Sequence, residues 1–116
     1  MNARFHYTPE RGDIVFANLS PQSGTEMAGQ HPCIVLSERT FSVATGWMVV
    51  CPITSKVKGS PFEVVLPPHL KTKGCVVASE IRTQDYAARG ARHVEKTSAA
   101  FMQSVQAIAC AVLGCP

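Results

Sequence analysis

The chain has 116 residues and a formal net charge of +3 at pH 7, with 46% hydrophobic and 16% charged residues. This composition excludes an intrinsically disordered chain, and the length predicts a single domain over residues 1–116. The mild positive charge permits an anionic partner without requiring one. No signal-peptide pattern and no apolar run of membrane-spanning length is present, so we expect a cytoplasmic protein without membrane contact.

The first third of the sequence predicts two strands joined by a long loop. Met1–Arg11 is polar and is expected to fray. The β-rich run Ile14–Leu19 predicts a strand, and the Pro-, Gly- and Ser-rich segment 20–30 predicts a loop. His31–Ser37 predicts the second strand, with a proline near its start, where a missing N–H is tolerated. Because structureless loops of this length are often functional, segment 20–30 is a candidate for part of a site.

The middle of the sequence predicts further strands around a basic loop. Thr40–Gly46 is a short connection with room for one helical turn. Trp47–Ile53 is almost entirely apolar and predicts a strand covered on both faces, with Trp47 in the core or at an interface. Thr54–Ser60 is a polar, basic loop, and Pro61–Leu66 predicts a strand that Pro67-Pro68 ends.

The last third predicts short extended segments followed by a helix. Strands or extended pieces are expected at Gly74–Ala78, Ser79–Ala87 and Arg89–Val94. Apolar residues at helical spacing predict an amphipathic helix over Thr97–Leu113, capped by Thr97 or Ser98 and ended by Gly114; its apolar face is expected to comprise Phe101, Val105, Ile108 and Val112. Five or six short strands and one terminal helix favour a small, mainly β barrel over an open parallel sheet.

Cysteine usage and charge say less about function. The five cysteines are odd in number and form no CxxC pair, so we expect free thiols, buried at Cys33, Cys51 and Cys75 within apolar runs. The histidines lack metal-ligand spacing, so neither a metal nor another cofactor is expected. Between Thr54 and Lys96, Lys and Arg outnumber Asp and Glu, which fits either a phosphate-binding surface or an ordinary solvated face.

Three groups of motifs together resemble the MazF/PemK family. The first comprises Arg11–Val15, the Gly-Thr-Glu-Met-Ala-Gly loop of residues 24–29 and the strand 32–37; the second comprises Cys51–Ser55 and Lys58–Val64; the third comprises Glu80–Asp85 and Ala88–Gly90. Their order and spacing, over almost the whole chain, carry the resemblance. It implies an SH3-like β-barrel of the kind shared with CcdB, with a C-terminal helix, a homodimer, and a sequence-specific endoribonuclease of a type II toxin–antitoxin system. It also implies a cognate antitoxin, whose disordered tail would fold across the toxin.

The sequence departs from the family pattern at three positions. A catalytic Arg usually precedes the proline of the second strand, and His31 stands there. Met27 replaces a Gln in the loop, and Glu80 replaces a Gln before the Ile-Arg-Thr segment. The first change concerns the catalytic mechanism, and the other two concern the RNA sequence that is preferred.

RNA cleavage without a metal needs only a few groups. The 2′-OH of RNA attacks the neighbouring phosphorus, one group removes its proton and another protonates the leaving 5′-oxygen, which leaves a 2′,3′-cyclic phosphate and a 5′-OH. On the family match we assign Glu26 as general base, His31 as general acid and Thr54 as a hydroxyl that binds a phosphoryl oxygen. An imidazole titrates near ~6.5 and can donate a proton, whereas a guanidinium, with a pKa above ~12, cannot readily do so. Each of the three assignments has a structural alternative. Glu26 could be an exposed loop acid, His31 an inactive substitution or a residue at a strand edge, and Thr54 a hydroxyl that only hydrogen-bonds at the end of a strand.

Residues around these three are expected to bind single-stranded RNA. Ser55, Lys56 and Lys58 can reach phosphates, and Arg82 either shapes the site or supports the dimer. The full set of expected RNA-binding residues is Thr25, Gln30, Ser55, Lys56, Lys58, Ser79, Glu80 and Arg82. Two alternatives to a fully active ribonuclease remain open: a non-enzymatic toxin or binding module similar to the gyrase poisons, and a catalytically weakened member that acts with its antitoxin in regulation.

Overall fold

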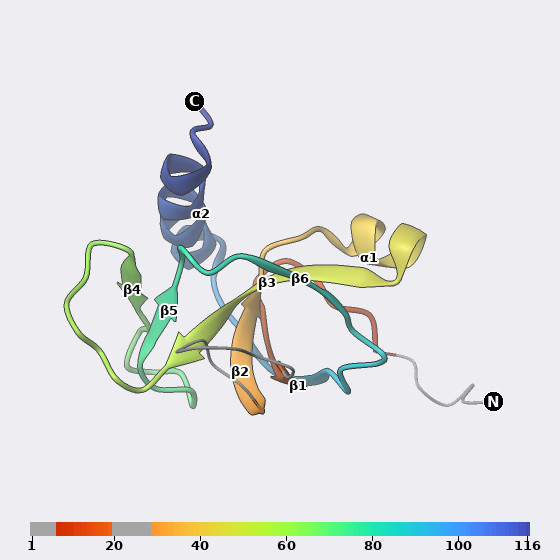
Figure 1. The fold of residues 1–116 in the computed structure, drawn as a ribbon. Helices are drawn as coiled ribbons and strands as arrows, with labels where there is room; N and C mark the ends of the chain where they lie inside the picture. Colours follow the sequence, from red (N-terminus) through yellow and green to blue (C-terminus); the bar gives the residue numbers. More distant parts are fainter. Residues whose placement is uncertain (1–6, 20–28) are drawn as a thin grey trace.

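The computed structural model describes residues 7–19 and 29–116, which form a curved antiparallel sheet with two helices (Figure 1). The strands in this part of the chain are β1 (Asp13–Asn18), β2 (Gln30–Val35), β3 (Trp47–Thr54), β4 (Glu63–Val65), β5 (Cys75–Val77), β6 (Arg82–Asp85) and β7 (Arg92–Lys96). The helices are α1 (Arg39–Thr45) and α2 (Ala99–Leu113). The architecture is the expected mainly β, barrel-like fold with a C-terminal helix.

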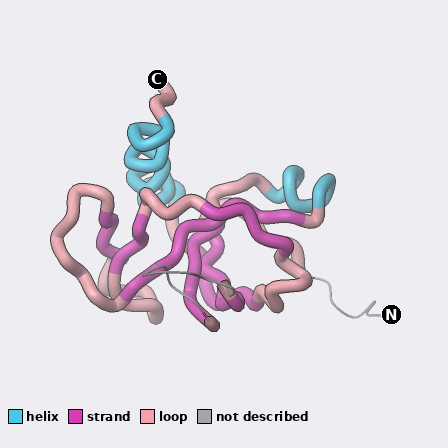
Figure 2. The backbone as a smooth tube through the Cα atoms, viewed as in Figure 1, coloured by secondary structure: helices cyan, strands magenta, loops and turns pink. Residues whose placement is uncertain are grey.

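β3 organises the sheet because it is long enough to pair with three other strands. The strand order is β4-β5-β3-β2-β1-β7, and β6 pairs with β3 outside this path. The first half of β3 pairs with β6, and its end, Ile53 and Thr54, pairs with β5. As a consequence, the sheet continues from β3 in two directions, through β5 and β4 on one side and through β2, β1 and β7 on the other. Both helices lie on the outside of the sheet (Figure 2).

The core consists of two apolar clusters separated by the sheet. Successive residues of a strand point to opposite faces, so Ile14 packs toward α2 while Val15 packs into the other cluster. The same alternation separates Ile34 from Cys33 and Val35 in β2. This arrangement explains the nearly continuous apolar runs in the sequence, because both faces of these strands are covered.

The helix α2 forms where it was expected and packs most of the predicted apolar face, Phe101, Val105 and Ile108, against the core. The Ser98 side chain accepts a hydrogen bond from the Phe101 N–H, and Gly114 ends the helix in a left-handed conformation. The buried residues are Phe101, Met102, Val105 and Ala109. Val112 is 42% exposed, so its assignment to the packed face was wrong. The helical spacing was right, but the last turn of α2 projects beyond the residues that cover the helix (Figure 1).

Other differences from the sequence-based prediction are local. The helical turn before β3 is a seven-residue helix, α1, that ends at the left-handed Gly46. Trp47 is 46% exposed and is therefore not a core residue, whereas Cys33, Cys51 and Cys75 are buried free thiols as predicted. Among the described residues, neither helix has the length and apolar character that crossing a membrane requires.

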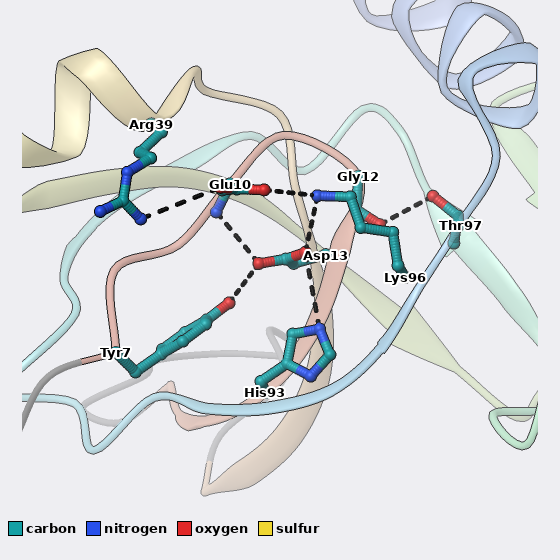
Figure 3. A network of polar contacts seen from close by, with 8 residues as sticks. All are labelled: Tyr7, Glu10, Gly12, Asp13, Arg39, His93, Lys96 and Thr97. Atoms are coloured by element: carbon teal, nitrogen blue, oxygen red, sulfur yellow. Dashed lines mark hydrogen bonds and ion pairs between the residues drawn. The ribbon is translucent and has the colours of Figure 1, made fainter.

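A polar network holds the segment before β1, where fraying was expected (Figure 3). Asp13, only 3% exposed, accepts a hydrogen bond from the Tyr7 hydroxyl at 2.5 Å and lies 3.1 Å from Lys96 Nζ and 3.6 Å from His93 Nε2. Burial, with the hydrogen bond to Asp13, raises the pKa of Tyr7. The prediction of fraying was thus wrong for residues 7–11, and residues 1–6 lie outside the described part of the chain.

Candidate active site

A cavity of about 570 Å³ opens where β2 begins and β3 ends. Six of the residues predicted to bind or cleave RNA line it: His31, Thr54, Ser55, Lys56, Lys58 and Glu80. Its remaining lining residues are Pro32, Ile53, Glu63, Lys73 and Val77. The fold therefore gathers two catalytic candidates and most of the basic loop in one place.

His31 and Thr54 lie near the same end of the β2–β3 ladder. Cys33 and Pro52 form the last pair of this antiparallel ladder. His31 precedes Cys33 by two residues, Thr54 follows Pro52 by two, and both residues line the cavity. Both side chains are partly exposed at the cavity. An imidazole and a hydroxyl in this position can act on the same phosphate group.

Local structure fixes the Thr54 hydroxyl at the end of β3. Its oxygen accepts a hydrogen bond from the Lys56 N–H at 3.1 Å, which turns the chain into the basic loop. The hydroxyl hydrogen is not used by this bond and can be donated to a phosphoryl oxygen. On the other side, Gly74 approaches so closely that a Cβ there would lie 2.0 Å from the Thr54 carbonyl oxygen. Gly74, with φ +116°, therefore positions Thr54.

Glu63 shapes the basic loop and was not singled out from the sequence. Its carboxylate accepts hydrogen bonds from the backbone N–H groups of Lys58 at 3.1 Å, Gly59 at 2.8 Å and Ser60 at 3.3 Å. These bonds fold the loop back over the start of β4, so the lysines are presented at the cavity rather than on an extended strand. The signal available in the sequence was an acid four residues after the Lys58-Gly59 pair.

Charges of both signs meet in the cavity. Lys73, also missed from the sequence, donates from Nζ to the carbonyl oxygens of Pro68 at 2.8 Å and Leu70 at 2.7 Å. Glu80 lies 3.2 Å from Arg82, whose side chain is only 12% exposed. Arg82 therefore reaches the cavity through Glu80 and does not line it. In the described part of the chain, no three His, Cys, Asp or Glu side chains gather as a metal-binding group.

The remaining predicted site residues fall into two groups. Gln30 and Ser79 are exposed neighbours of His31 and Glu80 that do not line the cavity. Thr25 and Glu26, with Met27, lie outside the described residues, so the structure does not place the predicted general base.

Comparisons with known proteins agree with this geometry. The sequence profile of the PemK-like, MazF-like toxins of type II toxin–antitoxin systems matches residues 10–113. The chain is 36% identical over 85 residues to the endoribonuclease toxin MazF of Escherichia coli K12, covering 73% of this chain and 76% of the relative. It is 32% identical over 100 residues to the E. coli endoribonuclease PemK, covering 83% and 75%.

Solved structures give the same result. The crystal structure of MazF from Deinococcus radiodurans superimposes with a TM-score of 0.90 at 38% identity, covering 94% of this chain and 99% of that one. A MazE–MazF complex from the same organism superimposes with a TM-score of 0.85 at 38% identity, covering 94% and 98%.

Proposed function

Because the chain belongs to the PemK-like, MazF-like toxin family of type II toxin–antitoxin systems, and is therefore an endoribonuclease toxin, we propose that it cleaves single-stranded RNA in the His31–Thr54 cavity. The observation that carries this proposal is that an imidazole at the start of β2 and a hydroxyl at the end of β3 line one cavity, beside lysines of the Thr54–Ser60 loop. A gyrase poison, which acts without cleaving RNA, would not need this combination of groups.

The substrate supplies its own nucleophile in this mechanism. Glu26 takes the proton of the attacking 2′-OH, and the attack forms the bond from the 2′-oxygen to phosphorus. The Thr54 hydroxyl donates to a phosphoryl oxygen and stabilises its developing charge. His31 in its protonated form gives a proton to the 5′-oxygen as the phosphorus–oxygen bond breaks. The products are a 2′,3′-cyclic phosphate and a 5′-hydroxyl, and the scheme requires no metal ion.

The lysines and polar residues around the cavity bind the phosphates and bases next to the cleaved bond. Lys56, Lys58 and Lys73 provide positive charge for the RNA backbone. Glu80, held by Arg82, offers a carboxylate that can accept hydrogen bonds from a base, in place of the family's Gln amide. Ser55 lines the cavity, Gln30 and Ser79 are proposed to extend this surface at its margins, and Thr25, outside the described residues, is proposed to contact RNA.

The test is digestion of a long single-stranded RNA by the purified chain in the presence of EDTA. We expect discrete fragments ending in a cyclic phosphate, and no cleavage where the nucleotide 5′ to the cut is 2′-deoxy. Substitutions His31→Ala and Thr54→Val should lower kcat, whereas His69→Ala, at an exposed histidine away from the cavity, should not. Intact RNA in EDTA, or a His31→Ala variant as fast as the parent, would contradict the mechanism.

Two assemblies complete the proposal. Relatives were crystallised as MazE–MazF complexes, so a cognate antitoxin is expected to place a disordered acidic tail over the basic cavity and exclude RNA in the cytoplasm. A homodimer would cover exposed apolar side chains such as Phe41, Trp47 and Leu113. Light scattering of the isolated chain tests the dimer, and competition between RNA and a synthetic antitoxin tail tests the shared surface.

A further inference from the structure

The carboxyl end of α2 brings two cysteines into contact. The Cys115 N–H donates to the Cys110 carbonyl oxygen at 2.9 Å, and the Gly114 N–H donates to the Ala111 carbonyl oxygen at 3.3 Å. Together with the left-handed Gly114, at φ +79°, these bonds define a Schellman motif. In this motif the residue after the glycine contacts the residue five positions earlier, commonly through apolar side chains. In this chain both residues are cysteines.

We propose that Cys110 and Cys115 form a redox-active dithiol that closes to an intramolecular disulfide by exchange with small anionic disulfides such as glutathione disulfide. The Cys115 sulfur already lies 3.3 Å from the Cys110 carbonyl oxygen. The hydrogen-bonded turn keeps the two residues adjacent, as the short Cα separation of a disulfide requires.

The surroundings of the pair favour reaction with a small anion. Both cysteines line a cavity of about 760 Å³ that Arg11 also lines, next to α2. Arg11 is held there by hydrogen bonds to the Leu36 carbonyl oxygen, at 2.9 Å, and to the Gln106 side chain. Its guanidinium can attract the carboxylates of glutathione, and it disfavours a bound cation. The cavity shares no lining residue with the His31–Thr54 cavity, so this inference does not depend on the proposed function.

The exchange proceeds in two balanced steps. The exposed Cys115, as thiolate, attacks one sulfur of glutathione disulfide, forms a mixed disulfide and releases one glutathione. Cys110 then loses its proton and attacks the Cys115 sulfur, which breaks the mixed disulfide and releases the second glutathione. The order follows from accessibility, because Cys115 is exposed whereas Cys110 is half-buried; a hydrogen bond with the Cys115 thiol also raises the pKa of Cys110. Two protein thiols are oxidised and one glutathione disulfide is reduced to two thiols.

The other three cysteines provide an internal comparison. Burial raises the pKa of Cys33 to about 12 and that of Cys51 to about 12, and it also raises the pKa of Cys75. A buried, protonated thiol is neither accessible nor nucleophilic. We therefore expect the folded chain to lose two titratable thiols to oxidation while three remain protected until it is unfolded.

The test is incubation of the full chain with glutathione disulfide, followed by rapid alkylation, intact-mass measurement and peptide mapping. The parent should yield the Cys110–Cys115 disulfide, two hydrogens lighter and without bound glutathione. Cys110→Ser should stop at a glutathione adduct on Cys115. A parent that accumulates a stable adduct, or that forms a covalent dimer on a non-reducing gel instead, would overturn the proposal.

A second variant tests the turn itself with both cysteines retained. Gly114→Ala strains the left-handed position without a steric clash, since nothing lies within 4 Å of a Cβ there. Closure of the disulfide should slow roughly tenfold, as expected for one strained left-handed residue. The matched control is Gly46→Ala, which places the same strain at the end of α1, at φ +78°, and should leave closure unchanged. Equal closure rates for Gly114→Ala and the parent would refute the role of the motif.

Discussion

Gly74→Ala is expected both to displace the Thr54 hydroxyl, which we propose takes part in catalysis, and to destabilise the fold. A Cβ at position 74 would lie 2.0 Å from the Thr54 carbonyl oxygen and 2.9 Å from the Ser55 Cα, which are backbone atoms with no flexible side chain to move aside. A left-handed non-glycine residue costs about 1–3 kcal/mol, and forcing atoms into a packed region costs a further ~1–3 kcal/mol. The two costs reach roughly 2–6 kcal/mol, a large share of the ~5–15 kcal/mol that stabilises a domain.

The assay for Gly74→Ala combines urea unfolding with the rate of RNA cleavage. The control is Gly90→Ala, at φ +64° with no atom within 4 Å of its Cβ, which has the backbone strain without the collision. Under conditions where both variants are folded, Gly74→Ala should lower kcat/KM by about 10²-fold, because a displacement near 1 Å has that effect on positioned groups. If the two variants unfold and cleave alike, Gly74 does not position Thr54.

Three further predictions concern single side chains. Because His31 is proposed to donate a proton, kcat should fall as the pH is raised, and His31→Arg should remove this fall because a guanidinium does not readily lose its proton. The measurement is kcat against pH, and a parental profile unchanged in His31→Arg would contradict the acid role. Glu63→Gln should raise KM for RNA several-fold more than it changes kcat, because a neutral amide oxygen accepts hydrogen bonds from the three loop N–H groups more weakly than a charged carboxylate does. The control is the exposed Glu38→Gln, and equal KM values would refute the role in the loop. Burial would raise the pKa of Glu95, but hydrogen bonds from the Lys71 and Thr72 N–H groups and the Thr72 hydroxyl outweigh it and lower the pKa. The stabilisation from Glu95 is thus present above the carboxyl pKa of the unfolded chain, ~4.3, and is lost as the pH falls through the lower folded value. The free energy of unfolding should therefore fall more steeply with acid in the parent than in Glu95→Gln, and parallel curves would contradict this.

Elements set by local pattern were predictable from the sequence, whereas their boundaries were less so. Alternating and continuous apolar runs indicated β1, β2 and β3, and the Ser98 cap and Gly114 marked both ends of α2. Phe101, Val105 and Ile108 of the α2 face were predicted, but the exposure of Val112 was missed because it depends on where the sheet stops, which helical spacing does not reveal. The ordered structure of residues 7–11 was missed for a similar reason. It depends on contacts of Asp13 with Tyr7, His93 and Lys96, two of which are distant in the sequence.

Site residues were predictable where a motif marked them and were missed where only the fold brings them in. His31 and Thr54 each stand in a recognisable motif, but Gly74 reaches Thr54 only because β5 pairs with the end of β3. Lys73 enters the cavity for the same reason, one residue earlier. Contacts between segments twenty residues apart depend on strand pairing, which a single sequence specifies only weakly.

The histidine at position 31 is therefore a chemical departure rather than a geometric one. The start of β2 places position 31 at the cavity that Thr54 also lines, and Gly74 fixes Thr54 from the other side; neither feature involves the imidazole. An arginine at position 31 would enter the same partly exposed site and bring a forked, permanently charged donor. What His31 adds, in the proposed mechanism, is a proton that can be transferred to the leaving oxygen. We therefore expect the same frame to support phosphate binding with either residue, and proton donation only with the histidine.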